Sequence, residues 1–189
     1  PVGLYTFRIT ARGGGHPPVV VRRSGEVRLA ASSRARGFDP ATFIATFYNG
    51  ADLTGTSFTR LYTEPIDFLR TCWEEGPPYA GCKLVAQLDD GNDYSVQWNG
   101  RLLVPATGEY VFIFANVDDG ARLFLDGTER ADNGWYWPAP DRRPSPRRIS
   151  LTAGWHNIRI EYEQRVYAAA SLQVRWSGPG FAEEVMPLV

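Results

Sequence analysis

The sequence predicts an all-β fold, an antiparallel β-sandwich. Three observations predict this class: short segments alternate apolar and polar residues, turn-forming residues separate these segments, and patterns of helical period are nearly absent. Successive side chains of a strand point to opposite faces, so alternation indicates a strand with one face in the core. Short strands of this kind, separated by turns rich in Gly and Pro, form sandwiches or barrels.

Residues 1–40 differ in pattern from the rest of the chain. Residues 4–9 and 19–21 suggest two strands, and three glycines at positions 13–15 lie between them. This region is either the tail of a preceding domain or a set of extra strands on the main sandwich, and the sequence leaves both interpretations open. Because the chain opens with Pro1 in place of Met, we expect it to be a piece of a larger protein.

Residues 41–189 carry the main series of predicted strands. Residues 94–98 alternate apolar and polar side chains, whereas residues 110–115 are apolar on both faces and indicate a central strand. Residues 155–162 and 171–176 alternate again. Turn sequences separate these segments: Ala106-Thr107-Gly108, Asp126-Gly127, Thr152-Ala153-Gly154 and Gly178-Pro179-Gly180. We therefore expect one sandwich domain over residues 41–189.

The composition argues against several functions. The 189 residues carry a formal net charge of −1, so no general attraction to nucleic acid is expected. No run of about 18 apolar residues is present, so we expect no insertion into a membrane. The adjacent carboxylates Glu74-Glu75 and Asp89-Asp90 do not match the separated pair of a glycosidase, and His16 and His156 lie in no catalytic motif. We expect a non-catalytic, monomeric module.

Cys72 and Cys82 lie in a segment rich in Pro and Gly. A disulfide bond would staple this loop, and such bonds are typical of proteins outside the cytosol. The alternatives are two free thiols in a cytosolic protein and a two-ligand zinc site, which no histidine near in sequence supports. We predict the disulfide bond and an extracellular or cell-surface location.

Asp118 and Asp119 are the most informative residues, because two adjacent carboxylates interrupt two strand-like runs. On a strand they would point to opposite faces, so joint binding of a cation requires a tight loop or a non-proline cis peptide bond. The cation indicated is calcium, which takes several oxygen ligands. The alternative is a hairpin turn, since Asp-Gly is among the commonest turn dipeptides. Taken alone, these residues favour the turn.

Eight motifs follow one another in the chain from about Phe43 onward. They are Phe47-Tyr48-Asn49 with Leu53-Thr54-Gly55, Arg60 with Ile66-Asp67-Phe68, residues 94–100, Pro105, residues 107–112, residues 118–127, residues 151–156, and residues 176–180 with Val185-Met186-Pro187. In this order they resemble the protective-antigen-fourteen domain. That β-sandwich is named after anthrax toxin protective antigen and also occurs in yeast flocculins, adhesins and bacterial glycosidases. The loop from Cys72 to Cys82 and residues 88–91 are inserted relative to the family pattern.

The resemblance implies calcium-dependent sugar binding. In lectin members of the family, two consecutive aspartates joined by a cis peptide bond hold the ion, and a second loop supplies a side-chain amide and backbone carbonyls. The aspartates correspond to Asp118 and Asp119. The second loop corresponds to residues 164–168, where the predicted ligands are the amide of Gln164 and the carbonyls of Val166 and Ala168. Calcium with open positions can accept two vicinal sugar hydroxyls.

Four more residues are candidates for contact with the sugar. Tyr136 and Trp137 belong to an aromatic cluster, and flat rings stack on the apolar faces of sugars. Arg165 and Tyr167 belong to the predicted second loop. We predict calcium as the cofactor and glycans, of a cell surface or a polysaccharide, as the partners. The alternatives are an ion-free structural or protein-interaction spacer of an adhesin, and a specificity appendage of a glycosidase.

Overall fold

The computed structural model describes residues 35–72, 76, 78–134, 146–165 and 169–189, and the backbone of residues 4–11 and 19–26. The chain divides into two compact units, Pro1–Arg34 and Ala35–Val189. In the first unit β1 (Leu4–Ala11) pairs antiparallel with β2 (Val19–Glu26). Both predicted N-terminal strands are therefore present, and each is longer than predicted.

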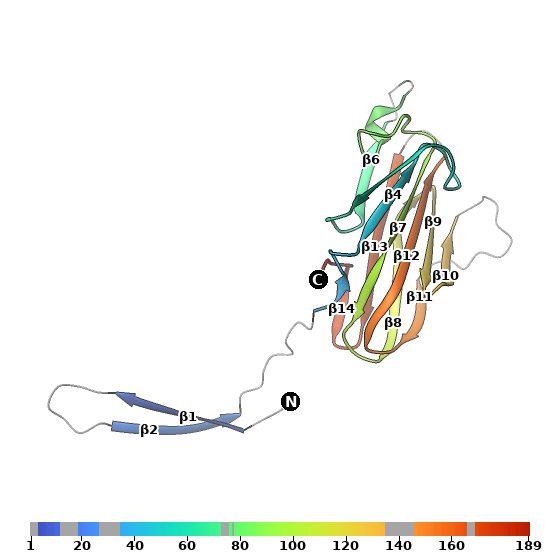
Figure 1. The fold of residues 1–189 in the computed structure, drawn as a ribbon. Helices are drawn as coiled ribbons and strands as arrows, with labels where there is room; N and C mark the ends of the chain where they lie inside the picture. The colour runs from blue at the N-terminus through green and yellow to red at the C-terminus, as the bar shows by residue number, and fades with distance from the viewer. Residues whose placement is uncertain are drawn as a thin grey trace. The chain divides into compact units, whose positions relative to one another are not determined.

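The second unit consists of two antiparallel β-sheets (Figure 1). One sheet has the order β10-β9-β12-β7-β4-β5, with β3 beside β7, and the other has the order β11-β8-β13-β14, with β6 beside β13. The strands are β3 (Gly37–Phe38), β4 (Ile44–Tyr48), β5 (Ser57–Leu61), β6 (Asp67–Thr71), β7 (Tyr94–Val104), β8 (Gly108–Asp118), β9 (Gly120–Leu125), β10 (Thr128–Asn133), β11 (Arg147–Leu151), β12 (Gly154–Gln164), β13 (Ala169–Gly178) and β14 (Phe181–Val185). A turn of 3-10 helix, η1 (Ala80–Cys82), precedes β7. The predicted all-β sandwich is confirmed.

The two sheets pack over a shared hydrophobic core. Its largest side chains include Trp98 from β7 and Trp176 from β13, both fully buried. On β12 the alternate residues Ile158, Ile160 and Tyr162 are buried. The alternation that predicted these strands therefore reports which face meets the core. Within the described residues, no helix has the length and apolar character needed to cross a membrane.

Cys72, which follows β6, and Cys82, which ends η1, form a disulfide bond with Cα atoms 5.4 Å apart. Both side chains are buried in the core cluster. The bond therefore holds the segment between β6 and β7 against the core, and the predicted pairing is confirmed.

Replacement of both cysteines, Cys72→Ala with Cys82→Ala, is expected to lower the free energy of unfolding by about 3 kcal/mol. The unfolded chain regains the freedom of a loop that spans ten positions. Urea unfolding of the oxidised wild type and the double variant measures the difference. Reduction of the wild type should lower its stability by a similar amount. A loss below about 1 kcal/mol in both experiments would contradict the role of the bond.

His156 joins two turns of the sandwich. Its Nδ1 lies 2.7 Å from Oδ2 of Asp126, in the turn between β9 and β10, and its Nε2 lies 2.9 Å from the carbonyl oxygen of Thr152. Burial alone would lower the pKa of His156, but the hydrogen bonds to Asp126 and to the Thr152 carbonyl and the negative charge of Asp126 together outweigh burial, so the pKa is raised. Burial alone would raise the pKa of Asp126, but hydrogen bonds from His156 and Asn157 and the positive charges of His156 and Arg130 together outweigh burial, so the pKa is lowered.

The stability contributed by this pair is expected to depend on pH. The stabilisation that comes from His156 is present below the usual histidine pKa and is lost as the pH rises through the raised pKa. The stabilisation that comes from Asp126 is lost as the pH falls through its lowered pKa. His156→Asn should therefore lower the free energy of unfolding most, by about 0.5–1 kcal/mol, between about pH 4 and pH 6.5. Melting curves of both proteins from pH 3 to 9 measure the difference, and a constant difference would contradict the pairing.

Candidate functional site

Asp118 and Asp119 lie where the chain passes from one sheet to the other. β8 ends at Asp118 in the five-stranded sheet, and β9 begins in the seven-stranded sheet. The alternative interpretation, a hairpin turn, is wrong, because β8 and β9 belong to different sheets. The peptide bond between the two aspartates is cis.

A second passage between the sheets lies beside the first. β12 ends at Gln164 in the seven-stranded sheet, and β13 begins at Ala169 in the five-stranded sheet. Glu163 of β12 lies opposite Gly120 of β9, and Ser171 of β13 lies opposite Asp118 of β8. Strand pairing in both sheets therefore brings the aspartates next to the start of the predicted second loop.

Hydrogen bonds tie Asp119 to this second passage. The backbone N–H of Asp119 donates to the carbonyl of Glu163 at 3.3 Å. The backbone N–H of Arg165 donates to Oδ2 of Asp119 at 2.7 Å. The Asp119 carboxylate is thus oriented by the main chain immediately after Gln164.

The carboxyl group of Asp118 is destabilised in its charged form. Burial, followed by the neighbouring negative charge of Asp119, raises the pKa of Asp118 to about 6. Two adjacent carboxylates in a half-buried place repel each other unless a cation offsets their charge. This electrostatic situation and the oxygen-rich donor set are compatible with a hard divalent cation.

Tyr162 connects Asp118 with Gln164 from inside the sandwich. Its hydroxyl donates to Oε1 of Gln164 at 2.7 Å and also contacts the carbonyl oxygen of Asp118. Gln164 is fully buried, and burial raises the pKa of Tyr162 well above its usual value. The ring of Phe68 packs edge-on against Tyr162, with centroids 5.2 Å apart. From the core side, Tyr162 therefore contacts both connections between the sheets, at Asp118 and at Gln164.

Arg165 links the second passage to a loop far away in sequence. Its guanidinium lies 2.8 Å from Oε2 of Glu163 and also pairs with Asp52. Asp52 has a left-handed backbone conformation in the loop between β4 and β5. The hydrogen bond to Glu163 is the main cause of the raised pKa of Arg165. Three strand connections thus meet around Asp119.

Sequence reasoning missed Asp52, Tyr162 and Glu163 as parts of this site. Asp52 directly precedes the motif Leu53-Thr54-Gly55, which was the available signal. Tyr162 carries the alternation of a core residue, and nothing in that pattern reveals the role of its hydroxyl. Alternation along β12 assigns Glu163 to the outer face, yet its side chain is only 1% exposed beside Arg165.

Five predicted positions, Tyr136, Trp137, Val166, Tyr167 and Ala168, lie outside the described residues. Among the residues that the structure describes, no group of three or more His, Cys, Asp or Glu side chains is suited to a metal. The predicted calcium site has two carboxylates, and its remaining ligands are neutral oxygen atoms. Calcium accepts backbone and amide carbonyls as ligands, so the predicted set fits its chemistry.

Residues 81–189 match the PA14 domain family. None of the curated proteins matches the chain. Among solved structures, an anti-sigma factor domain-containing protein from Clostridium clariflavum has a TM-score of 0.61 and 22% identity over 82% of this chain. The match spans 46% of that protein.

Two further structures carry sugar-binding descriptions. The PA14 sugar-binding domain from an RTX adhesin has a TM-score of 0.52 and 20% identity over 76% of this chain and 93% of its own. The epithelial adhesin 6 A domain from Candida glabrata, in complex with Galb1-3GlcNAc, has a TM-score of 0.52 and 11% identity, over 81% of this chain and 89% of its own. These likenesses establish the shared fold. Since more than half of its residues match the family, the chain belongs to the PA14 domain family, the protective-antigen-fourteen domain that its motifs resemble.

Proposed function

We propose that this chain is a non-catalytic carbohydrate-binding module that recognises a glycan through a calcium ion held by Asp118 and Asp119. The observation that carries the proposal is the meeting of two strand connections at these aspartates, with Arg165 donating to Asp119 at 2.7 Å. The pairing of Glu163 with Gly120 and of Ser171 with Asp118 supports the proposal, because Glu163 and Ser171 flank the predicted second loop. A glycan-binding role is also consistent with the sugar-binding domains that share the fold.

The residues of this chain would hold and orient the site. Asp118 and Asp119 supply two carboxylates, and the backbone N–H of Arg165 sets the direction of the Asp119 carboxylate. Tyr162 holds the backbone carbonyl of Asp118 and the amide of Gln164 in place. Gln164, Val166 and Ala168 remain the proposed neutral ligands. A calcium ion bound there would offset the carboxylate charges and present open positions to two vicinal hydroxyls.

The partners and the location follow from the same proposal. The glycan would belong to a cell surface or a polysaccharide, and Tyr136, Trp137, Arg165 and Tyr167 would contact it. The disulfide bond between Cys72 and Cys82 favours an extracellular or cell-surface protein, since cytosolic thiols are kept reduced. The module is proposed to act as a monomer within a larger protein.

Calorimetric titration with calcium chloride tests the ion site directly. The wild-type domain, freed of metal, should bind one calcium ion per chain. The double variant Asp118→Asn with Asp119→Asn keeps the size of both side chains but removes both charges, and it should bind none. Unchanged binding in this variant, or no binding by the wild type at millimolar calcium, would contradict the proposed site.

A further inference from the structure

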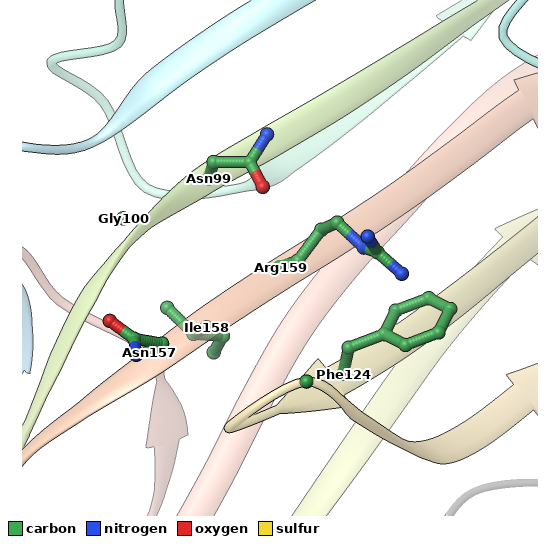
Figure 2. Close-up of a pocket in the computed structure, with 7 residues that line it drawn as sticks. Asn99, Gly100, Phe124, Asn157, Ile158 and Arg159 are labelled. Atoms are coloured by element: carbon green, nitrogen blue, oxygen red, sulfur yellow. The ribbon is translucent and has the colours of Figure 1, made fainter.

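A hollow lies on the outer face of the seven-stranded sheet, away from the two passages between the sheets. It has a volume of about 390 Å³ and is lined by Asn99, Gly100, Phe124, Gly127, Asn157, Ile158 and Arg159 (Figure 2). These residues come from β7, β9, β12 and the turn after β9. Arg159 and Gln164 are five positions apart on β12, which separates them by about 17 Å along the strand.

Strand register places three side chains of this hollow in one row. Asn99 of β7 lies opposite Arg159 of β12, and Arg159 lies opposite Phe124 of β9. The row continues on the other side of Asn99 to Ile44 of β4 and Leu61 of β5. Ile44 is 40% exposed and Leu61 is 51% exposed. The five strands that contribute these residues, spaced at about 4.8 Å, make this row about 19 Å wide, so it runs across the sheet as an elongated strip.

The centre of the strip is held in a defined conformation. The guanidinium carbon of Arg159 lies 3.8 Å from the centroid of the Phe124 ring. Figure 2 shows the side chain of Arg159 reaching from β12 toward that ring. Cation–π contact of this kind fixes the guanidinium before any ligand arrives.

Arg159 supplies the positive charge at the hollow. Arg159 is the charged side chain among the residues that line the hollow. Its Nε lies 3.1 Å from Oε1 of Glu161, but the same carboxylate also accepts from Arg122 at 2.5 Å and from Gln97 at 3.0 Å. One carboxylate is therefore shared by two guanidinium groups, and Glu129 of β10, opposite Phe124, adds a second carboxylate at the end of the row.

Two exposed amides lie next to this cation: Asn99 is opposite it on β7, and Asn157 is two residues before it on β12. Asn99 and Asn157 both face solvent at the hollow. The Asn99 amide donates to Gln97 at 2.8 Å, which orients it on the sheet. A carboxamide offers both donors and an acceptor, which suits sugar hydroxyls. The hollow thus combines a fixed cation, two amides and an apolar extension.

We propose that this strip is a second glycan-binding site, independent of calcium, that recognises a uronic acid within an acidic polysaccharide. The guanidinium of Arg159 holds the sugar carboxylate through paired N–H groups. Asn99 and Asn157 hydrogen-bond the ring hydroxyls. Neighbouring sugars of the chain lie along the row, with their apolar faces over Ile44 and Leu61. This site does not rest on the calcium site, and either one can fail alone.

Titration with a hexamer of galacturonic acid, in a chelator and at low salt, tests the proposal. The chelator removes any contribution of Asp118 and Asp119. The wild type is expected to bind this hexamer at least tenfold more tightly than neutral xylohexaose. Arg159→Gln should weaken the binding at least tenfold, and Asn157→Ala at least threefold, whereas Asp119→Ala should leave it unchanged.

A matched control separates a site from general attraction to cations. Arg148 lies on β11 in the other sheet, and its side chain is 73% exposed and pairs with the exposed Glu109. Arg148→Gln removes one positive charge, as Arg159→Gln does. Its binding should equal that of the wild type. The proposal is overturned if the wild type binds no galacturonate hexamer in chelator or binds xylohexaose equally well. It is also overturned if Arg148→Gln weakens binding as much as Arg159→Gln. Asn157→Ala, on an exposed side chain, keeps the test decisive if Arg159→Gln fails to fold.

Discussion

Calcium at a hundredfold excess over its dissociation constant is expected to stabilise the wild-type domain by about 2.7 kcal/mol, and Asp119→Ala is expected to remove this effect. The ion is expected to bind the folded state only, because the unfolded chain does not hold the two loops together. For a domain of this size the shift in melting temperature is about 5–10 °C. Melting curves in calcium and in chelator measure it.

Glu109→Gln is the matched control for this experiment. Glu109 lies on the same strand as Asp118, at its other end, and its side chain is 56% exposed. Its replacement removes one negative charge and should leave the calcium-dependent shift intact. A shift that persists in Asp119→Ala, or disappears in Glu109→Gln, would contradict the assignment of the ion to Asp118 and Asp119.

Arg165→Met is expected to lower the free energy of unfolding by about 3 kcal/mol, even in chelator. The reason lies in Glu163, whose carboxylate is only 1% exposed and takes Arg165 as an ion-pair partner at 2.8 Å. Loss of the guanidinium leaves a buried negative charge with less compensation. Chemical unfolding of the variant and the wild type measures the loss.

A double-mutant cycle separates this effect from lost packing. Combining Arg165→Met with Glu163→Gln removes the buried charge together with its partner, and the double variant should be more stable than Arg165→Met alone. Asp52→Asn, which removes the more exposed partner of Arg165, should cost less than about 1 kcal/mol. If the two changes at Arg165 and Glu163 add without coupling, the ion pair does not stabilise the site.

The strands of the sandwich could be predicted because their pattern is local. Trp98 and Ile160 each occupy an alternating segment, and both are buried where the alternation places them. The pairing of Cys72 with Cys82 was equally accessible, because a disulfide across a short loop depends on few other parts of the fold. Local sequence information is sufficient for features of this kind.

The connection at Asp118 could not be predicted from its own residues. Asp119-Gly120 has the composition of a hairpin turn, and only the assignment of β8 and β9 to different sheets makes it a passage between them. That assignment depends on pairing with β13 and β12, which are distant in sequence. The family resemblance carried this information, whereas turn propensity did not.

The partners of Arg165 could not be predicted from the sequence for the same reason. Asp52 is 113 positions away in sequence, and no pattern within one segment links the two side chains. Gln164 illustrates a further limit. Alternation with Ile160 and Tyr162 assigns it to the inner face, where its Oε1 meets the hydroxyl of Tyr162. Its role as a calcium ligand stays a prediction.

Glycan binding with and without calcium tests the central claim most directly. A glycan array probed with the wild-type domain in calcium, the same domain in chelator, and Asp119→Ala in calcium makes the comparison. Recognition through calcium predicts specific binding of sugars with vicinal hydroxyls in the first case and loss of that binding in the other two. Binding to the same sugars that survives both the chelator and Asp119→Ala would contradict recognition through a calcium ion.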